Sequence, residues 1–113
     1  MAIRRGPESY VQSACKQYLE LKGWTVRRMQ AGAVQDKRGI PVRMHEAGTG
    51  DLMATMRYWT TYNLDLHRIV WVECKAANGK QSDKQKQFQA EAEERGESYV
   101  LAYSIDDLIK AGL

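Results

Sequence analysis

The feature that most constrains the fold is the strand-forming run 69–72, which the tripeptide 73–75 follows directly. Successive apolar residues are typical of a strand buried on both faces, so we expect this strand at the centre of a sheet. Side chains alternate along a strand, so Glu73 and Lys75 should point to one face and Cys74 to the other. Charges placed against a buried strand are costly unless they have a function.

A second carboxylate, Asp51, follows the glycine-containing turn 48–50 and begins another expected strand. If the two strands are neighbours, Asp51 and Glu73 lie close enough to share one divalent cation. The main-chain carbonyl of Cys74 is available as a third ligand, and Mg²⁺ prefers oxygen ligands and keeps several waters. Metal-assisted phosphodiester hydrolysis needs this arrangement. Lys75 is placed to orient or deprotonate the attacking water, or to stabilise the developing charge.

Length and composition favour one folded domain over residues 1–113, because the chain has 113 residues of which 43% are hydrophobic. The sequence contains no apolar stretch of membrane-spanning length and no leader, so we expect a cytoplasmic protein without a membrane partner. The net charge of +3 is mild and fits a polyanionic partner without requiring one. Cys15 and Cys74 are expected as buried free thiols in a reducing compartment.

Local signals predict the element order α-β-β-β-α-β-α, which makes a mixed sheet flanked by helices. The predicted elements are a helix from Pro7 to just before Gly23, strands over 24–29, 51–56 and 69–75, a helix from Ser82 to Arg95, a strand over 98–103 and a short C-terminal helix after Ser104. We expect a loop over 30–41 and a short strand over 42–45. The segment 57–67 permits either a strand extension or a hairpin.

Gln85 and Glu8 each have a structural explanation beside a functional one. Ser82 and Gln85 form a capping box, but a helix that begins beside the metal would also bring Gln85 near a bound phosphate or water. Glu8 suits the positive end of the first helix dipole. It also extends the apolar stripe of that helix, where it could ligate the metal through water. Both residues stay open between the two roles.

Several basic residues are candidate phosphate contacts because they cluster before Asp51 and around the start of the second helix. They are Arg27, Arg28, Lys37, Arg38, Arg43, Lys80, Lys84 and Lys86. Each alone is more often just a solvated charge, but their clustering favours phosphate contacts. The two histidines, His45 and His67, lack the spacing of a metal pair, although His45 is close enough to Asp51 to line the same groove.

Taken in order, these residues resemble the PD-(D/E)XK nuclease superfamily, with Gly50 in place of the proline before Asp51. The closer resemblance is to its VRR-NUC family. Three features carry it: the N-terminal helix with Glu8, the segment Gly48 to Leu52, and the run Lys80 to Gln85 followed by Phe88. Stand-alone members of this size occur in bacteriophages and bacteria.

The resemblance implies an αβββαβ core and DNA cleavage that depends on Mg²⁺ or Mn²⁺, without a small-molecule cofactor. It implies catalytic roles for Asp51, Glu73, Lys75, Gln85 and Glu8. Some stand-alone members are dimers that cut branched DNA such as four-way junctions, so we expect a structure-selective endonuclease. The alternatives are a nuclease with little structure preference, one that cuts RNA, or a nucleic-acid-binding module that has lost activity.

We expect a homodimer, because symmetric cleavage of a four-way junction needs two sites related by a two-fold axis. The expected interface is the segment 57–67, which belongs to no obvious part of the core. It carries Tyr58, Trp59, Tyr62 and Leu64. Exposed together, these would make a large apolar patch, whereas the alternative is that the segment folds back on its own sheet or that its aromatics stack on bases.

Overall fold

The computed structural model describes residues 7–29, 33–35, 38, 41–43, 48–59, 61–62 and 65–113, which form a mixed α/β fold. Its elements are α1 (Pro7–Leu21), β1 (Thr25–Arg28), β2 (Ala33–Gln35), β3 (Pro41–Arg43), β4 (Leu52–Trp59), β5 (Asp65–Cys74), α2 (Asp83–Glu94), β6 (Ser98–Ala102) and α3 (Ile105–Lys110). The main sheet has four strands in the order β1-β4-β5-β6, while β2 and β3 pair separately. The β1–β4 and β4–β5 pairs are antiparallel and the β5–β6 pair is parallel. The predicted order therefore holds for the main sheet.

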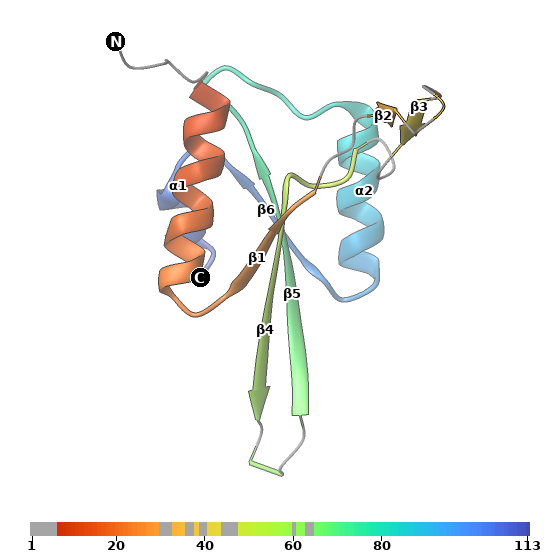
Figure 1. The fold of residues 1–113 in the computed structure, drawn as a ribbon. Helices are drawn as coiled ribbons and strands as arrows, with labels where there is room; N and C mark the ends of the chain where they lie inside the picture. Colours follow the sequence, from red (N-terminus) through yellow and green to blue (C-terminus); the bar gives the residue numbers. More distant parts are fainter. Residues whose placement is uncertain are drawn as a thin grey trace.

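Helices cover both faces of this sheet, with α1 and α3 on one face and α2 on the other (Figure 1). Val70, Val72 and Cys74 of β5 pack in the hydrophobic core with Cys15 and Leu19 of α1. We call this the α1 face. The alternate residues of β5 point to the α2 face, as the strand period requires.

On the α2 face, the ring of Phe88 from α2 packs edge-on against Trp71 of β5, with centroids 4.9 Å apart. Trp71 and Glu73 therefore share one face of the central strand. Cys74 points to the other face, and both cysteines are buried and free. These placements confirm what the alternation in 69–75 predicted. Among the described helices, none combines the length and apolar character that a membrane span needs.

The helices begin and end where the sequence predicted. Gly23 follows α1 with φ +97 and Gly96 follows α2 with φ +84, and an L side chain would be strained at both. Ser82 caps α2 with the predicted capping box. Ser104 caps α3 and accepts a hydrogen bond from the Asp106 N–H.

The strands β4 and β5 extend well beyond their neighbours (Figure 1). β1 pairs with β4 only over 52–55, and β6 pairs with β5 only over 70–74. Among the described residues, 56–59 and 65–69 therefore have only each other as ladder partners. We call this two-stranded extension the arm. It combines the two alternatives for 57–67, because it both extends the strands and forms a hairpin.

Three predicted boundaries were wrong. The strands expected over 51–56 and 69–75 are longer toward the arm, because they pair with each other beyond the core. The expected loop over 30–41 includes β2 and the first residue of β3, which pair through Val34 and Val42. The strand expected over 42–45 is observed as β3, and residues 44–45 lie outside the described residues.

Candidate metal centre

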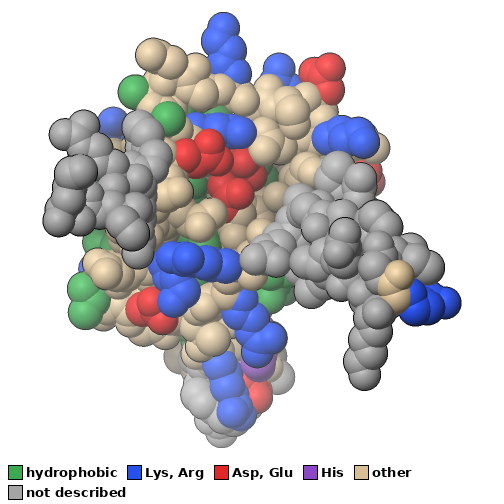
Figure 2. All heavy atoms as spheres, turned by 45° about the horizontal axis from the view of Figure 1, so that its top comes forward, with side chains coloured by type: hydrophobic (Ala, Val, Ile, Leu, Met, Phe, Trp, Pro, Cys, Tyr) green, Lys and Arg blue, Asp and Glu red, His purple; other side chains and the backbone are tan. Residues whose placement is uncertain are grey.

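The two carboxylates meet where β4 begins and β5 ends. Leu52 lies opposite Val72 in the ladder, so the next pair outward is Asp51 and Glu73. Asp51 Oδ2 accepts a hydrogen bond of 2.8 Å from the Cys74 N–H. Figure 2 shows acidic side chains gathered in a hollow on this end of the molecule, with lysine and arginine side chains around them. The structure thus brings the predicted pair together.

Glu73 stands out among the polar residues that the structure describes, because its side chain is only 1% exposed. Its Oε1 accepts a 2.7 Å hydrogen bond from Gln85 Nε2 and lies 3.4 Å from Lys75 Nζ. Its Oε2 is buried and has no hydrogen-bond partner among the described residues. An unsatisfied buried oxygen is costly and is expected where a ligand completes the site.

Both carboxyl groups resist ionisation in the metal-free site. The pKa of Glu73 is raised to about 7, first by burial and then by the charge of Asp51, whereas Lys75 acts in the opposite direction. Burial also raises the pKa of Asp51, although the hydrogen bond from the Cys74 N–H opposes this rise. A cation between the two carboxylates would offset the cost of ionising them.

The third oxygen that could complete the site belongs to the main chain of Cys74. A residue in an antiparallel strand directs its N–H and C=O to the same neighbouring strand. The Cys74 N–H points to Asp51, and the Lys75 N–H donates to Ala102 O of β6 on the other side at 3.0 Å. The Cys74 carbonyl therefore faces the side on which Asp51 lies.

This donor set suits a hard cation. Among the described residues, no group of three or more His, Cys, Asp or Glu side chains is placed to hold a metal ion. The site instead offers two carboxylates and one carbonyl. Mg²⁺ is commonly held by one or two carboxylates with retained waters, and Mn²⁺ accepts the same ligands.

The side chain of Lys75 packs against the turn at Gly79, a contact that the sequence did not predict. A Cβ at Gly79 would lie 3.1 Å from Lys75 Cβ and 3.2 Å from Lys75 Cδ, so the glycine leaves room for the lysine chain. The Gly79 carbonyl accepts a 2.9 Å hydrogen bond from Tyr103. The side chain of Lys75 is only 13% exposed. The sequence feature that could have predicted this packing is the glycine at position 79, shortly after the charged end of the strand.

Gln85 makes the predicted capping-box contacts and also reaches the carboxylate of Glu73. Its Oε1 accepts from the Ser82 N–H at 2.8 Å, while its Nε2 donates to Glu73. The turn before Asp51 packs on the same helix start, since a Cβ at Gly48 would lie 2.5 Å from the Lys84 carbonyl oxygen. Gly48, which has φ +90, therefore ties the Asp51 side of the site to the Gln85 side.

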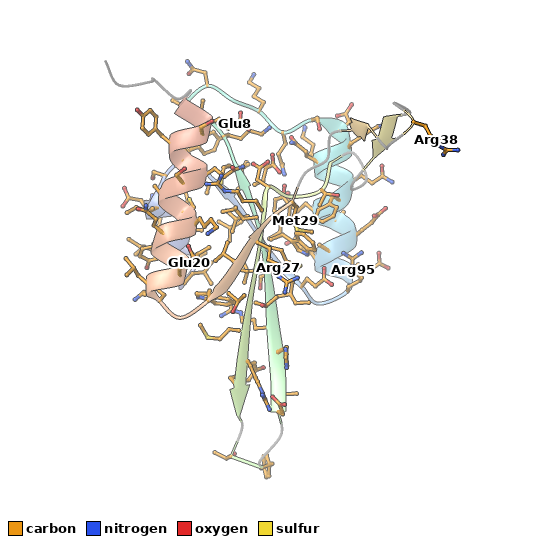
Figure 3. The ribbon with its side chains drawn as sticks, viewed as in Figure 1. Glu8, Glu20, Arg27, Met29, Arg38 and Arg95 are labelled. Carbon is orange, nitrogen blue, oxygen red and sulfur yellow. The ribbon has the colours of Figure 1, made fainter. Side chains whose placement is uncertain are left out.

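Glu8 lies in the first turn of α1 and is exposed. Its charge contributes to the raised pKa of both Asp51 and Glu73, which places it near the site. Figure 3 shows Glu8 at the N-terminal end of α1, at the same end of the molecule as the acidic hollow. Glu8 thus lies near the carboxylates, and its role in the site stays a prediction.

The predicted basic residues divide into groups. Arg27 of β1 lies opposite Met53, which lies opposite Trp71, so Arg27 is on the α2 face. Arg28 is on the α1 face, where it donates to Ser13 of α1 at 3.4 Å. The exposed lysines at the start of α2 are Lys80, Lys84 and Lys86.

The remaining candidates lie elsewhere. Arg38 lies at the outer end of the small hairpin and points away from the body (Figure 3). Lys37 and His45 lie outside the described residues, as does the side chain of Arg43 in β3. His67 is on the arm, 3.8 Å from Asp65.

Comparison with family models, with curated proteins and with solved structures finds no match. What the protein does must therefore be inferred from the chemistry of the site. The site combines two carboxylates that are hard to ionise and a largely buried lysine, with basic side chains on two sides. One carboxylate oxygen has no hydrogen-bond partner among the described residues. This combination can bind a divalent cation and an anionic substrate beside it.

Proposed function

We propose that the protein is a DNA endonuclease that depends on Mg²⁺ or Mn²⁺. The observation that carries this proposal is the buried Oε2 of Glu73, which has no hydrogen-bond partner among the described residues and belongs to a carboxylate paired with Asp51. A protein would not keep a costly buried carboxylate next to a second one for stability. A cation that both carboxylates share explains why they lie together.

The residues that would hold the ion are Asp51, Glu73 and the carbonyl of Cys74. A divalent ion bound there would polarise a phosphate oxygen and make a bound water a better nucleophile. Gln85 fixes one oxygen of Glu73 by its 2.7 Å hydrogen bond, so that the other oxygen keeps its direction. The Cys74 N–H does the same for Asp51.

Lys75 supplies the positive charge on the substrate side of the site. Its ammonium lies 3.4 Å from Glu73 Oε1, on the same face as the carboxylate. From there it can orient or deprotonate the attacking water, or stabilise the charge that develops on the phosphate. Glu8, which acts on the site through its charge, would hold a water of the ion at the outer side.

The family proposal follows from the same residues. The main sheet and its helices follow the order α1-β1-β4-β5-α2-β6, which supports a PD-(D/E)XK core, and Gln85 bonded to Glu73 supports the VRR-NUC family within it. We further propose the stand-alone phage or bacterial type, which acts in the cytoplasm and prefers branched DNA such as a four-way junction.

A homodimer belongs to this proposal, with the arm as its interface. Tyr58 and Leu66 lie opposite each other on the arm, and both are exposed, as is Tyr62. The side chain of Trp59 and the residue Leu64 lie outside the described residues. Sedimentation at micromolar concentration tests the dimer, and a monomer that cuts junctions at full rate would end it. The variant Tyr58→Ser with Leu66→Ser tests the interface.

The function is tested with a panel of single-stranded, duplex, flap and four-way DNA, together with RNA, with Mg²⁺, Mn²⁺ or chelator. We expect divalent-dependent cuts that are fastest on the branched DNA. Glu73→Gln should remove them, whereas Glu94→Gln, which changes an exposed carboxylate at the far end of α2, should not. Binding without divalent-dependent cleavage would contradict the proposal and favour a nucleic-acid-binding module.

A further inference from the structure

At its inner end the arm packs against the core through Met56, and from there it extends beyond the four-stranded part of the sheet. Residues 56–59 and 65–69 pair only with each other among the described residues, and the side chains of Arg57, Tyr58, Leu66 and His67 are exposed. A two-stranded ribbon alone is only marginally stable in water. Its extension beyond the sheet therefore indicates a partner that contacts it.

The charge of the arm and of β1 is positive. These strands carry Arg27, Arg28, Arg57 and Arg68 against the single carboxylate Asp65, which gives the same excess of +3 as the whole chain. By contrast, α2 carries two lysines and four carboxylates. Figure 2 shows lysine and arginine side chains below the acidic hollow, toward the arm. A polyanion next to the metal centre would therefore lie along β1 and the arm rather than along α2.

The arginines of these strands differ in the face they occupy. Arg57 lies opposite His67, and His67 shares the α2 face with Trp71 by the period of the strand, so Arg27 and Arg57 follow the same face as Glu73. Arg68 is on the α1 face, where its guanidinium lies 5.6 Å from the centroid of Trp24. The substrate side thus has two arginines in a line from the metal centre.

We propose that β1 and the arm form a track for duplex DNA along the α2 face, so that cleavage needs a paired segment of about eight base pairs on one side of the cut. The inference rests on the proposed function, since the metal centre marks the cut. The α1 face of the arm, with Tyr58 and Leu66, stays available for a second copy.

The length of the paired segment follows from the similar rise per residue of a strand and per base pair of B-DNA. A strand advances about 3.4 Å per residue and B-DNA advances about 3.4 Å per base pair, so one residue of β5 corresponds to about one base pair. Arg27, level with Trp71, lies about two base pairs from the cut, and Arg57, level with His67, lies about six. The described arm ends at Asp65, about eight base pairs away.

Asp65 modulates the outer contact. Its Oδ1 lies 2.7 Å from Arg57 Nε and 3.8 Å from His67 Nε2, so it partly neutralises this end of the track. A phosphate that approaches Arg57 must compete with this carboxylate. Asp65→Asn keeps the shape of the side chain and removes its charge, and it should therefore strengthen binding of long duplexes.

The test measures cleavage of DNA with a paired segment of about 4, 8, 12 or 16 base pairs on one side of the cut and single strands on the other. For the native protein, the rate should rise up to about eight base pairs and then level off. Arg27→Ala should slow cleavage at every length. Arg57→Ala should slow it about tenfold, with a smaller salt dependence, only where the paired segment passes about six base pairs.

Arg68→Ala is the matched control, because it removes an arginine from the same part of the arm on the opposite face. It should change the rate less than Arg57→Ala, and thermal melting checks that both variants fold. The inference would be overturned by a cleavage rate that does not depend on the paired length. Equal decreases of the rate in Arg57→Ala and Arg68→Ala would also overturn it. A changed sedimentation coefficient for Arg57→Ala would also overturn it, because the α2 face of the arm would then contact another copy.

Failure of the function can be told apart from failure of the track. If no substrate is cut with either metal, the proposed function is wrong. Fluorescence anisotropy with the Glu73→Gln protein then measures the affinity for the same duplexes without cleavage. An affinity that rises to about eight base pairs and falls in Arg57→Ala would still support the track. An affinity that is independent of length would reject it.

Discussion

The two ends of β5 carry carboxylates with opposite environments. Asp65, on the arm, is exposed, and the hydrogen bond from Arg57 lowers its pKa. Glu73, at the metal centre, is 1% exposed and has its pKa raised to about 7 by burial and by Asp51. Both have a basic side chain within 4 Å, since Lys75 lies 3.4 Å from Glu73. A basic neighbour therefore does not decide the ionisation of a carboxylate in this protein.

The ionisation of a carboxylate in this protein is decided by its access to water and by how many of its oxygens have hydrogen-bond partners. Water solvates the charge of Asp65 on the arm, so its ion pair with Arg57 is an ordinary surface contact that contributes little to stability. Glu73 has lost its water, and one oxygen has gained no partner in exchange. The first arrangement is complete in itself, whereas the second is complete only with a ligand. The comparison separates a carboxylate that serves the fold from one that serves a site.

The largest effect is expected from removing either charge of the metal centre. Asp51→Asn or Glu73→Gln should lower cleavage by on the order of a thousandfold, because each removes a metal ligand but keeps the shape of the side chain. DNA binding should stay the same or increase, since negative charge is lost. Cleavage assays and anisotropy measure both. A variant that cuts at the native rate with Mg²⁺ would show that the site is misassigned.

The next effect concerns stability in the absence of metal. The pKa of Glu73 in the folded protein, about 7, lies above the ordinary glutamate value of 4.5, so the folded state holds the proton more tightly. The free energy of unfolding should therefore fall by roughly 3 kcal/mol as the pH rises from about 4.5 to 7. Asp51 shifts in the same direction.

Glu73→Gln should remove most of this fall and make the metal-free protein more stable than the native protein at neutral pH. Urea denaturation with chelator at pH values on both sides of the window measures it. Added Mg²⁺ should reverse the slope for the native protein, because the ion binds the ionised carboxylates. Equal pH dependence in both proteins would mean that Glu73 is not the group that titrates.

Lys75→Ala should have a somewhat smaller effect, a loss of cleavage of about a hundredfold with retained metal affinity. Lys75 is not a ligand, but its charge lowers the pKa of Glu73. Its removal should therefore also move the pH–rate profile to higher pH. Calorimetric titration with Mn²⁺ measures the affinity, and a collapse of metal binding would contradict the role given to Lys75.

The smallest effect is expected at the other end of the strand. Arg57→Ala or Asp65→Asn should move the thermal midpoint by less than about 2 °C, because the pair is solvated. The difference in urea midpoint between each variant and the native protein should also stay nearly constant across the pH window in which the metal centre titrates. A large destabilisation would mean that the arm contributes to the fold, and the contrast between the two ends would then disappear.

The sequence predicted the inner half of the molecule well because its patterns are local. Strand alternation placed Glu73 and Lys75 on one face and Cys74 on the other. The Ser82 and Gln85 pair has the spacing of a capping box, and the structure contains both of its hydrogen bonds. These features depend on residues a few positions apart, which a single sequence shows directly.

The arm and the hairpin of β2 and β3 could not be predicted in the same way. Segment 57–67 lacks the apolar pattern of a core strand, and its residues 57–58 and 65–68 are exposed. The sequence also could not predict that one oxygen of Glu73 lacks a hydrogen-bond partner among the described residues, since this depends on what surrounds Glu73 in space. The packing of Gly48 on Lys84 and of Gly79 on Lys75 likewise depends on contacts that the sequence does not display.

The hydrogen bonds of Gln85 have a consequence for the residue types that this position can accept. The oxygen of its amide accepts a hydrogen bond from the Ser82 N–H, and its nitrogen donates one to Glu73. Glutamate is as good as glutamine in a capping box, but glutamate has no N–H to donate and would repel Glu73. A lysine or arginine could donate but could not cap. Only an amide of this length serves as acceptor and donor at once, so one side chain sets both where α2 begins and which way Glu73 points.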